Sequence, residues 1–304
     1  MNEHVGTVFE SDSAPQASSW SQDRRLKFIE FRLRWDGKIN RNDLTDFFSL
    51  SVPQASADLS KYSEAAPLNL SYDKKAKCYV RGEGFNPIYP QSGARTYLNE
   101  LLALSTNVIE SKSSFIGWRP SLGAAPIPER TLDEHVLSLV IQSIREKRKL
   151  RVSYQGMNRP DPIDRNISPH ALGFDGFRWH VRAYCHLRND FRDFVIGRLS
   201  EVTIGDTSDV EGTSDEQWND ILTLILVPHP GLSLGGQRAI SMEYGMIDGS
   251  VQLHCRHALL FYALRRLRLE QAEDASQGAT QQIILVNRRE LKPYFDQLTT
   301  KGTQ

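Results

Sequence analysis

Two adjacent cysteine–histidine pairs are the residues best equipped for nucleophilic chemistry. Cys185 precedes His186, and His254 precedes Cys255. A catalytic dyad needs the thiol and the imidazole within hydrogen-bond reach, but both pairs fall in segments with strand-like alternation, where neighbouring side chains point to opposite faces. The chain also contains no GxSxG, P-loop, HExxH or GxGxxG motif. The sequence therefore argues against an enzyme.

The remaining residues with cofactor or metal chemistry are scattered. The glycine-rich run 231–236 lacks the lysine context of a phosphate loop, and His229 between two prolines is interpreted as a turn residue rather than a ligand. Three cysteines lie far apart, with no CxxC pair and no zinc spacing. We therefore expect no cofactor, no metal site and a reducing, cytoplasmic environment.

Another group of polar residues is suited to reading nucleic acid. Ser51 fits a helix N-cap, and small or amide-bearing residues follow it, beginning with Gln54. Glutamine can form a bidentate bond to adenine, and an alanine methyl can contact the thymine methyl. A lysine-rich turn further along the chain could hold the phosphate backbone. The predicted DNA-contacting residues are Arg41, Asn42, Ser51, Gln54, Ala55, Ser56, Lys61, Tyr62, Lys74, Lys75 and Lys77.

The elements around these residues follow a recognisable order. We expect a helix capped by Ser21 and ending at Asp36, a short helix over 43–50, and a third helix over 54–64 after Ser51 and Pro53. Two strands over 68–80 then form a hairpin. This order predicts a winged helix-turn-helix, whose second helix of the pair enters the major groove. A three-helix packing domain with a solvated lysine turn is the alternative.

Charge is distributed unevenly along the chain. Lys+Arg and Asp+Glu each total 37, so the net charge is zero and a uniformly basic nucleic-acid coat is excluded. Residues 21–82 carry 12 basic and 8 acidic side chains, whereas residues 207–304 carry 9 and 12. The front of the chain is thus suited to an anionic partner. No apolar run approaches the ~20 residues of a membrane span, so no membrane partner is expected.

The rest of the chain predicts a multi-domain α+β protein. Hydrophobic period changes from 3.6 to two near Leu150, which indicates a small, strongly bent sheet or barrel of about five strands. A β-α-β-α-β alternation follows and predicts a ferredoxin-like layer. The expected domains are a flexible arm (1–20), a winged helix-turn-helix (21–82), a helical connector (83–130), the central sheet domain (131–206) and a C-terminal extension (207–304).

The central unit resembles the WYL domain family of bacterial regulators. The segments that carry the resemblance are LRVSY at 150–154, NISPHALGF at 166–174, GFRWHVRAYCHLRNDFRDF at 176–194 and IGRLSEV at 196–202. With the flanking units it covers nearly residues 21–300, and it extends to the WYL repressors encoded beside phage-defence systems such as BREX and CBASS. The resemblance implies a homodimer that binds inverted repeats, an Sm/SH3-like barrel with a basic ligand pocket, and a ferredoxin-like dimerisation extension.

The same resemblance implies a set of ligand-binding residues. They are Tyr154, Ser168, His170, Arg178, Arg182 and Arg198. Arg178 and Arg182 would lie on one strand face about 13 Å apart, which suits two phosphates of an oligonucleotide. The tyrosine could stack on a base. The alternative is that these arginines form surface ion pairs with Asp175, Asp190 or Asp193.

These observations favour a cytoplasmic, homodimeric, sequence-specific repressor of a phage-defence operon. It would bind double-stranded DNA at an inverted repeat and be released by a nucleotide or oligonucleotide effector in the WYL pocket. The alternative function is a ligand-sensing adaptor that controls a nuclease or helicase partner rather than a promoter.

Overall fold

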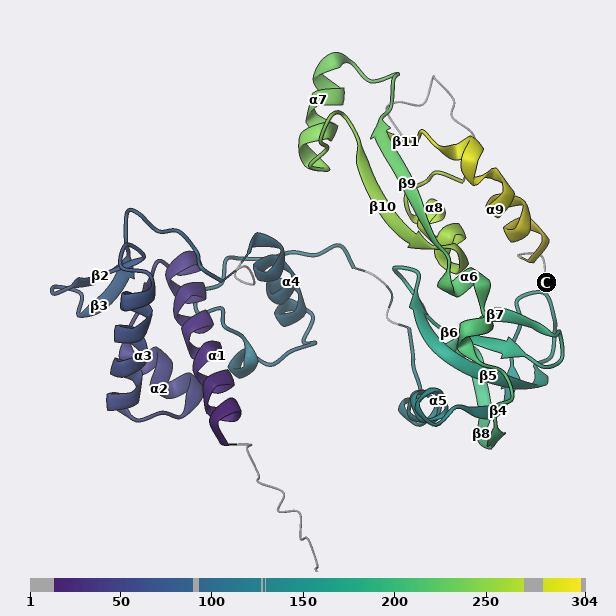
Figure 1. Cartoon of the computed structure of the whole chain (residues 1–304), viewed down its shortest axis with the longest axis horizontal. Coiled ribbons are helices and arrows are strands. Elements are labelled where there is room, and N and C mark those ends of the chain that lie inside the picture. The colour runs from purple at the N-terminus through teal and green to yellow at the C-terminus, as the bar shows by residue number, and fades with distance from the viewer. Residues whose placement is uncertain (1–13, 90–92, 127, 129, 271–280, 302–304) are drawn as a thin grey trace, which may run out of the picture. The chain divides into compact units, whose positions relative to one another are not determined.

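A computed structural model describes residues 14–89, 93–126, 128, 130–270 and 281–301 of the chain. Two compact units, residues 1–127 and 128–304, are each described by themselves (Figure 1). Residues 1–13 of the predicted flexible arm lie outside the described residues.

Three helices form the framework of the first unit. They are α1 (Ala14–Trp35), α2 (Arg41–Phe48) and α3 (Val52–Ala65). Ser51 caps α3 as predicted, since its side chain accepts a hydrogen bond from the Gln54 N–H. The predicted start of the first helix was wrong, because α1 already begins at Ala14. Pro15 in its first turn is tolerated because the N–H it lacks has no partner there.

A small antiparallel sheet accompanies these helices. It consists of β1 (Lys38–Ile39), β2 (Leu70–Asp73) and β3 (Cys78–Arg81) in the order β1-β3-β2. The predicted hairpin is therefore present, with its turn at residues 74–77. The two-residue β1 was missed because so short a segment carries no periodic signal.

The helix of the predicted connector belongs to the core of the first unit. Helix α4 (Ala94–Ser105) packs Leu101 and Leu104 against Phe31 of α1, and a 3₁₀ turn, η2 (Ser111–Ser113), follows it. Trp35 and Tyr97 stack with their ring centroids 4.5 Å apart. This segment is thus more than a spacer, since its aromatic and aliphatic side chains extend the hydrophobic packing of α1.

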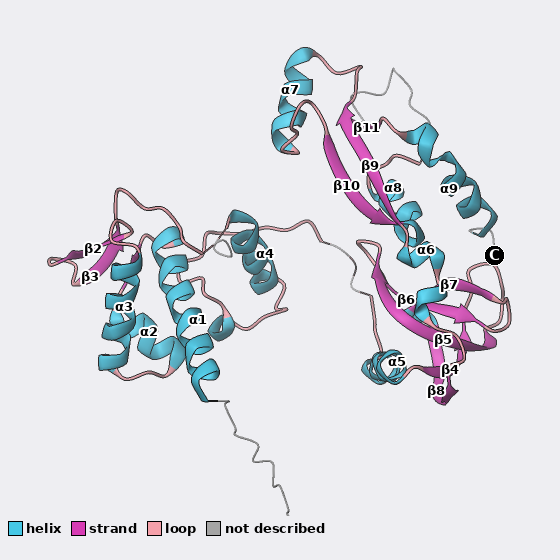
Figure 2. Cartoon of the chain, in the orientation of Figure 1, coloured by secondary structure: helices cyan, strands magenta, loops and turns pink. Residues whose placement is uncertain are grey.

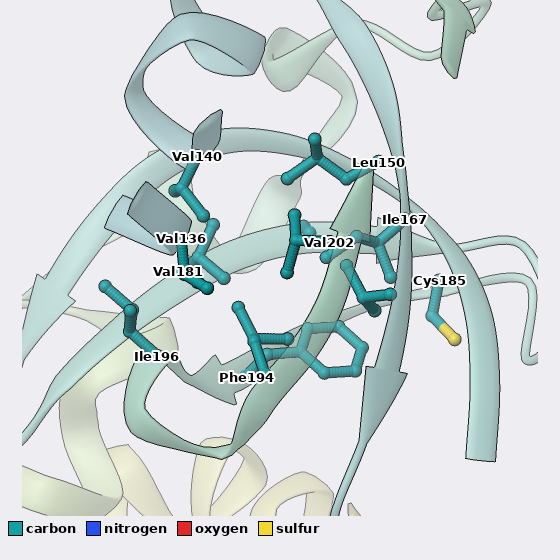
Figure 3. Packing of buried hydrophobic residues seen from close by; sticks show 12 residues of the cluster. Val136, Val140, Leu150, Ile167, Val181, Cys185, Phe194, Ile196 and Val202 are labelled. Atoms are coloured by element: carbon teal, nitrogen blue, oxygen red, sulfur yellow. The ribbon is translucent and has the colours of Figure 1, made fainter. Parts of the chain in front are cut away.

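The second unit begins with a helix against a five-stranded antiparallel sheet. The elements are α5 (Glu134–Glu146), β4 (Arg148–Tyr154), β5 (Ile163–Phe174), β6 (Trp179–Cys185), β7 (Asp190–Val195), η3 (Ile196–Arg198) and β8 (Leu199–Thr207), and the sheet order is β7-β6-β5-β4-β8. Figure 3 shows Val136 and Val140 of α5 packed over Leu150, Val181 and Phe194 of the sheet. The period-two pattern of the sequence reflects this single buried face.

A second, smaller sheet completes the unit. The elements are η4 (Gly212–Ser214), α6 (Glu216–Asn219), β9 (Ile221–Pro228), α7 (Leu234–Glu243), β10 (Val251–Arg256), η5 (His257–Leu259), α8 (Leu260–Arg266), β11 (Ile283–Leu285) and α9 (Arg288–Lys301). Figure 2 shows the α-helices and strands among them. Both outer strands run antiparallel to β9, in the order β10-β9-β11. The predicted β-α-β-α-β alternation is present, with α9 in addition. No helix in the described part of the chain is both long and apolar enough to cross a membrane.

Candidate functional site

The N-terminal half of α3 presents a small polar surface. Ser51 is exposed, and the half-buried Gln54 lies one turn along the same helix. The Gln54 Nε2 donates to Asp58 Oδ1 over 3.2 Å, while Asp58 itself is fully buried and pairs with Arg25 of α1 at 2.6 Å. One N–H of the Gln54 side-chain amide is therefore held by the carboxylate of the Arg25–Asp58 ion pair. Ser56, also half-buried, donates its hydroxyl to the Val52 carbonyl.

Two residues of the predicted DNA-contacting set lie in the core instead. Ala55 and Tyr62 are both fully buried, and the Tyr62 hydroxyl donates to Glu30 Oε2 over 3.1 Å. Burial and the neighbouring Glu30 charge raise the pKa of Tyr62. The prediction that these two residues contact DNA was wrong, because positions 55, 59 and 62 repeat at helical spacing on the inner face of α3. That spacing was available from the sequence.

The hairpin tip carries cations without intramolecular partners. Lys74, Lys75 and Lys77 are exposed, and in the described part of the chain none of their ammonium groups forms an ion pair. The Asp73 side chain accepts hydrogen bonds from the Lys75 and Ala76 N–H groups and so fixes the turn. Three lysines on a fixed turn can hold phosphate oxygens.

The remaining members of this predicted set border α2 and the far end of α3. Arg41 and Asn42 are exposed at the start of α2. Lys61 is exposed as well, but its ammonium donates to the Gln22 side chain of α1. Nine of the eleven predicted residues therefore lie wholly or partly at the surface, with Ala55 and Tyr62 the exceptions.

Two cavities in the second unit are lined jointly by the five-stranded sheet and by α8. Their volumes are about 620 Å³ and 910 Å³, and Tyr154 lines both. Arg182 lines the smaller cavity, and Arg178 and Arg198 line the larger one. The larger lining contains Arg130, Arg178, Arg198, Arg265, Arg266 and Arg268 against the carboxylates of Asp175 and Asp193. Such a site favours an anion.

Arg182 is the most completely paired of these arginines. It is buried, and its guanidinium donates to both carboxylate oxygens of Asp215, at 2.7 and 3.0 Å, to Asp193 at 3.3 Å and to Gln217 at 3.1 Å. Burial opposes ionisation of Asp215, but hydrogen bonds from His170 and Arg182 outweigh it and lower the Asp215 pKa. Burial dominates at Asp193, whose pKa is raised despite the Arg182 charge.

Arg178 is paired through a second carboxylate. Its Nε donates to Asp175 Oδ2 over 3.0 Å, and His180 Nε2 lies 3.0 Å from the same oxygen. Burial alone would raise the Asp175 pKa, but the hydrogen bonds from His180 and from the Phe177 and Arg178 N–H groups lower it. The alternative of arginine ion pairs is thus present for Asp175 with Arg178 and for Asp193 with Arg182, although Arg182 in the latter pair is buried, and Asp190 pairs with Arg192 instead. Arg198, by contrast, forms no side-chain pair with any described residue.

Two residues of the predicted pocket set, Ser168 and His170, lie outside the linings of both cavities. Ser168 is buried and exchanges hydrogen bonds with His186 and Ser208, at 2.8 Å in each case. His170 Nε2 lies 2.9 Å from Asp215 Oδ2. The polar groups of both residues are therefore engaged within the fold, Ser168 with His186 and Ser208 and His170 with Asp215, and a ligand contact by either residue stays a prediction.

Comparison with known proteins follows the same three-part division. Residues 21–103 match the model of the BrxR transcriptional regulator winged helix-turn-helix domain, residues 135–204 match the WYL domain, and residues 221–291 match the BrxR C-terminal dimerization domain. The DNA-binding transcriptional repressor CapW of Stenotrophomonas maltophilia is 45% identical over 277 residues, which covers 91% of this chain and 93% of that protein. The chain belongs to the BrxR/CapW family of WYL-domain transcriptional repressors.

Other BrxR/CapW relatives are similarly close. CapW of Escherichia coli (strain KTE188) is 41% identical, covering 95% of this chain and 97% of the relative, and CapW of Pseudomonas aeruginosa is 40% identical, covering 91% and 93%. The family resemblance predicted from the sequence is confirmed, and the family is one of repressors rather than enzymes.

Sequence reasoning about this BrxR/CapW chain missed the contribution of α8. Phe261 and Tyr262 line both cavities, and Arg265, Arg266 and Arg268 line the larger one. Tyr262 packs its ring 4.9 Å from that of His180. The run FYALRRLR offered a signal, since arginines and aromatics alternate there at helical spacing, but its position beside the WYL sheet depends on the tertiary fold.

Proposed function

We propose that this protein is a homodimeric, sequence-specific DNA-binding repressor of a phage-defence operon. The observation that carries the proposal is that one segment, which matches a winged helix-turn-helix model, presents both surface polar residues at the N-terminal end of α3 and three exposed lysines at the hairpin turn. In such a module the helix reads base edges and the wing holds the backbone. Ser51, Gln54 and Ser56 are the proposed readers.

The proposed operator is an inverted repeat of double-stranded DNA. A symmetric dimer places two reading helices so that each meets one half-site. The match of residues 221–291 to a dimerization domain supports this arrangement. We also propose that the five-stranded sheet forms an Sm/SH3-like barrel and that the small sheet forms a ferredoxin-like layer. The proposed location is the cytoplasm.

The proposed effector is an anionic nucleotide or oligonucleotide bound in the joint cavities. Arg198, Arg266 and Arg268 line the larger one without a carboxylate partner among the described residues, and Tyr154 offers an aromatic ring. Arginine forks suit phosphate oxygens, and aromatic rings stack on bases. Release of the operator requires that effector and DNA weaken each other's binding reciprocally.

The test is a titration of the purified dimer with DNA that carries its own upstream inverted repeat, and with random DNA of the same length. Gln54→Ala is expected to lose about 1–3 kcal/mol on the inverted repeat and little on random DNA, because a base contact is removed. Gln142→Ala, which removes a glutamine from α5 of the other unit, is the matched control and leaves both affinities unchanged. Equal losses on both DNAs would contradict a base-reading role for Gln54.

The same titration separates the adaptor alternative. A wild-type protein that binds the inverted repeat no more tightly than random DNA would refute the operator proposal. The WYL cavities would then remain as the sensor of a protein that controls a nuclease or helicase partner.

A further inference from the structure

The central strand of the small C-terminal sheet is apolar on both faces. Strand β9 reads ILTLILVP, in which six of the eight residues are aliphatic. Near-continuous apolar runs of this kind are typical of strands covered on both sides, whereas a strand with one wet face alternates apolar and polar residues. The sequence of β9 therefore predicts that other elements cover both faces of this strand.

The structure supplies one of these layers. Leu222, Leu224 and Leu226 point into a core that includes Ile240 of α7 and Leu264 of α8, and each is at most 5% exposed. The alternate residues of β9 point the other way, and none of them belongs to this core. Helices α7, α8 and α9 thus all pack on this one face of the sheet.

The uncovered face is aliphatic and nearly uncharged. We define the open face as Ile221, Thr223, Ile225 and Val227 of β9 with Ile284 and Val286 at β11. Ile284 pairs with Val227, and the Val286 N–H donates to the Ile225 carbonyl, so these side chains are neighbours. Ile221 and Val286 are 50% and 56% exposed.

Polar residues of β10 flank the open face. On β10, His254 lies opposite Thr223 and its Nδ1 is 3.2 Å from the threonine hydroxyl. Arg256, opposite Ile221, is already held, because its guanidinium lies over the Trp218 ring and donates to the Trp218 carbonyl. The charge of Arg256 lies at one end of the open face, whereas the apolar rows of β9 and β11 carry no charge and can meet an identical copy across a twofold axis.

We propose that the open face is the dimer interface and that its occupant is the same face of a second copy. The match of this domain to a dimerization domain identifies the kind of partner, and the aliphatic composition identifies the face. Two sheets packed face to face at about 10 Å would bury both apolar rows. This inference rests on the proposed homodimer and adds the surface that forms it.

The experiment is sedimentation of the full chain and two charge variants across a concentration series. Val286→Glu places a carboxylate among the apolar side chains of the open face, next to Ile225, so the dissociation constant of the dimer rises by about 30-fold or more. Met242→Glu introduces the same charge at an 83%-exposed apolar residue of α7, away from the open face, and leaves the dimer intact. A dimeric Val286→Glu protein, or a monomeric Met242→Glu protein, would overturn the proposal.

A second measurement covers the outcome in which Val286→Glu fails to fold. Thr223→Cys on the open face is expected to give covalent dimers with a short bis-maleimide, and Met242→Cys is not. Cross-linking at Met242→Cys alone would place the interface on α7 instead. A wild-type chain that sediments as a monomer throughout would refute the proposed dimer itself, whereas a wild-type dimer insensitive to Val286→Glu refutes only this face.

Discussion

Cations are used in opposite ways in the two units of the chain. At the wing of the first unit, Lys74, Lys75 and Lys77 stand exposed with no carboxylate partner among the described residues. In the WYL sheet, Arg178 and Arg182 are locked to Asp175, Asp193 and Asp215. The exposed lysines are available to bind phosphate, whereas the charges of the two arginines are compensated by carboxylates within the fold.

The difference separates residues that bind from residues that hold the binding site. A buried arginine must be paired, because an unpaired buried charge is strongly unfavourable. The arginines free to meet an effector are therefore the ones at the rim of the cavities, such as Arg198 and Arg266, and not the buried one. Each of the four predictions that follow tests one side of this distinction.

The largest expected effect is at the buried pair. Asp215→Asn removes the charge that compensates Arg182, and the free energy of unfolding should fall by about 3 kcal/mol at pH 7. The control is Glu211→Gln, whose exposed pair with Lys147 contributes at most about 0.5 kcal/mol. Urea unfolding measures both. If the two variants were equally stable, the distinction between buried, paired charges and exposed ones would not hold.

The same variant carries a pH signature. The Asp215 pKa is lowered in the folded protein, so the carboxylate stabilises the fold fully above its unfolded pKa of about 3.9. That contribution is lost as the pH falls towards the folded pKa. The stability gap between wild type and Asp215→Asn should therefore be constant from pH 5 to 7, on the order of a few kcal/mol, and narrow below about pH 4.

An intermediate effect is expected at the rim of the larger cavity. Arg198→Ala removes an unpaired guanidinium, and affinity for a fluorescently labelled short oligothymidylate should fall by about 1.5–3 kcal/mol with little change in stability. Arg151→Ala is the matched control, since Arg151 is exposed, pairs with Asp164 and lines neither cavity. Equal weakening by both variants would show only general attraction of the probe by positive charge.

The smallest effect is expected at the wing. Lys75→Ala should lower the slope of log affinity against log salt by about 0.9, equally on cognate and random DNA, because one phosphate contact is lost. Lys112→Ala in the same unit, whose ammonium already pairs with Glu110, should leave the slope unchanged. A sequence-dependent loss from Lys75→Ala would move this lysine from the backbone-contacting group to the base-reading group.

Local sequence patterns predicted most of the helices and strands, but they did not predict contacts between residues far apart in the chain. The Ser51 cap, the lysine hairpin and the alternation of β6 are fixed by neighbours along the chain, and all are present. The alternative of arginine ion pairs named Asp175, Asp190 and Asp193 as carboxylates, whereas the main partner of Arg182 is Asp215, 33 residues away on another element. Long-range pairing of this kind leaves no periodic trace in a single sequence, and neither does the contribution of α8 to the cavities.

The Asp215 carboxylate connects the WYL sheet to α6. Its carboxylate accepts hydrogen bonds from Arg182 of β6 and also from the Trp218 N–H, which caps the first turn of α6. Trp218 in turn carries Arg256 at the end of β10. A movement of Arg182 would thus act on the start of α6 and the end of β10 together, because the contacts run from Arg182 through Asp215 and Trp218 to Arg256 and so connect the WYL sheet to the small sheet.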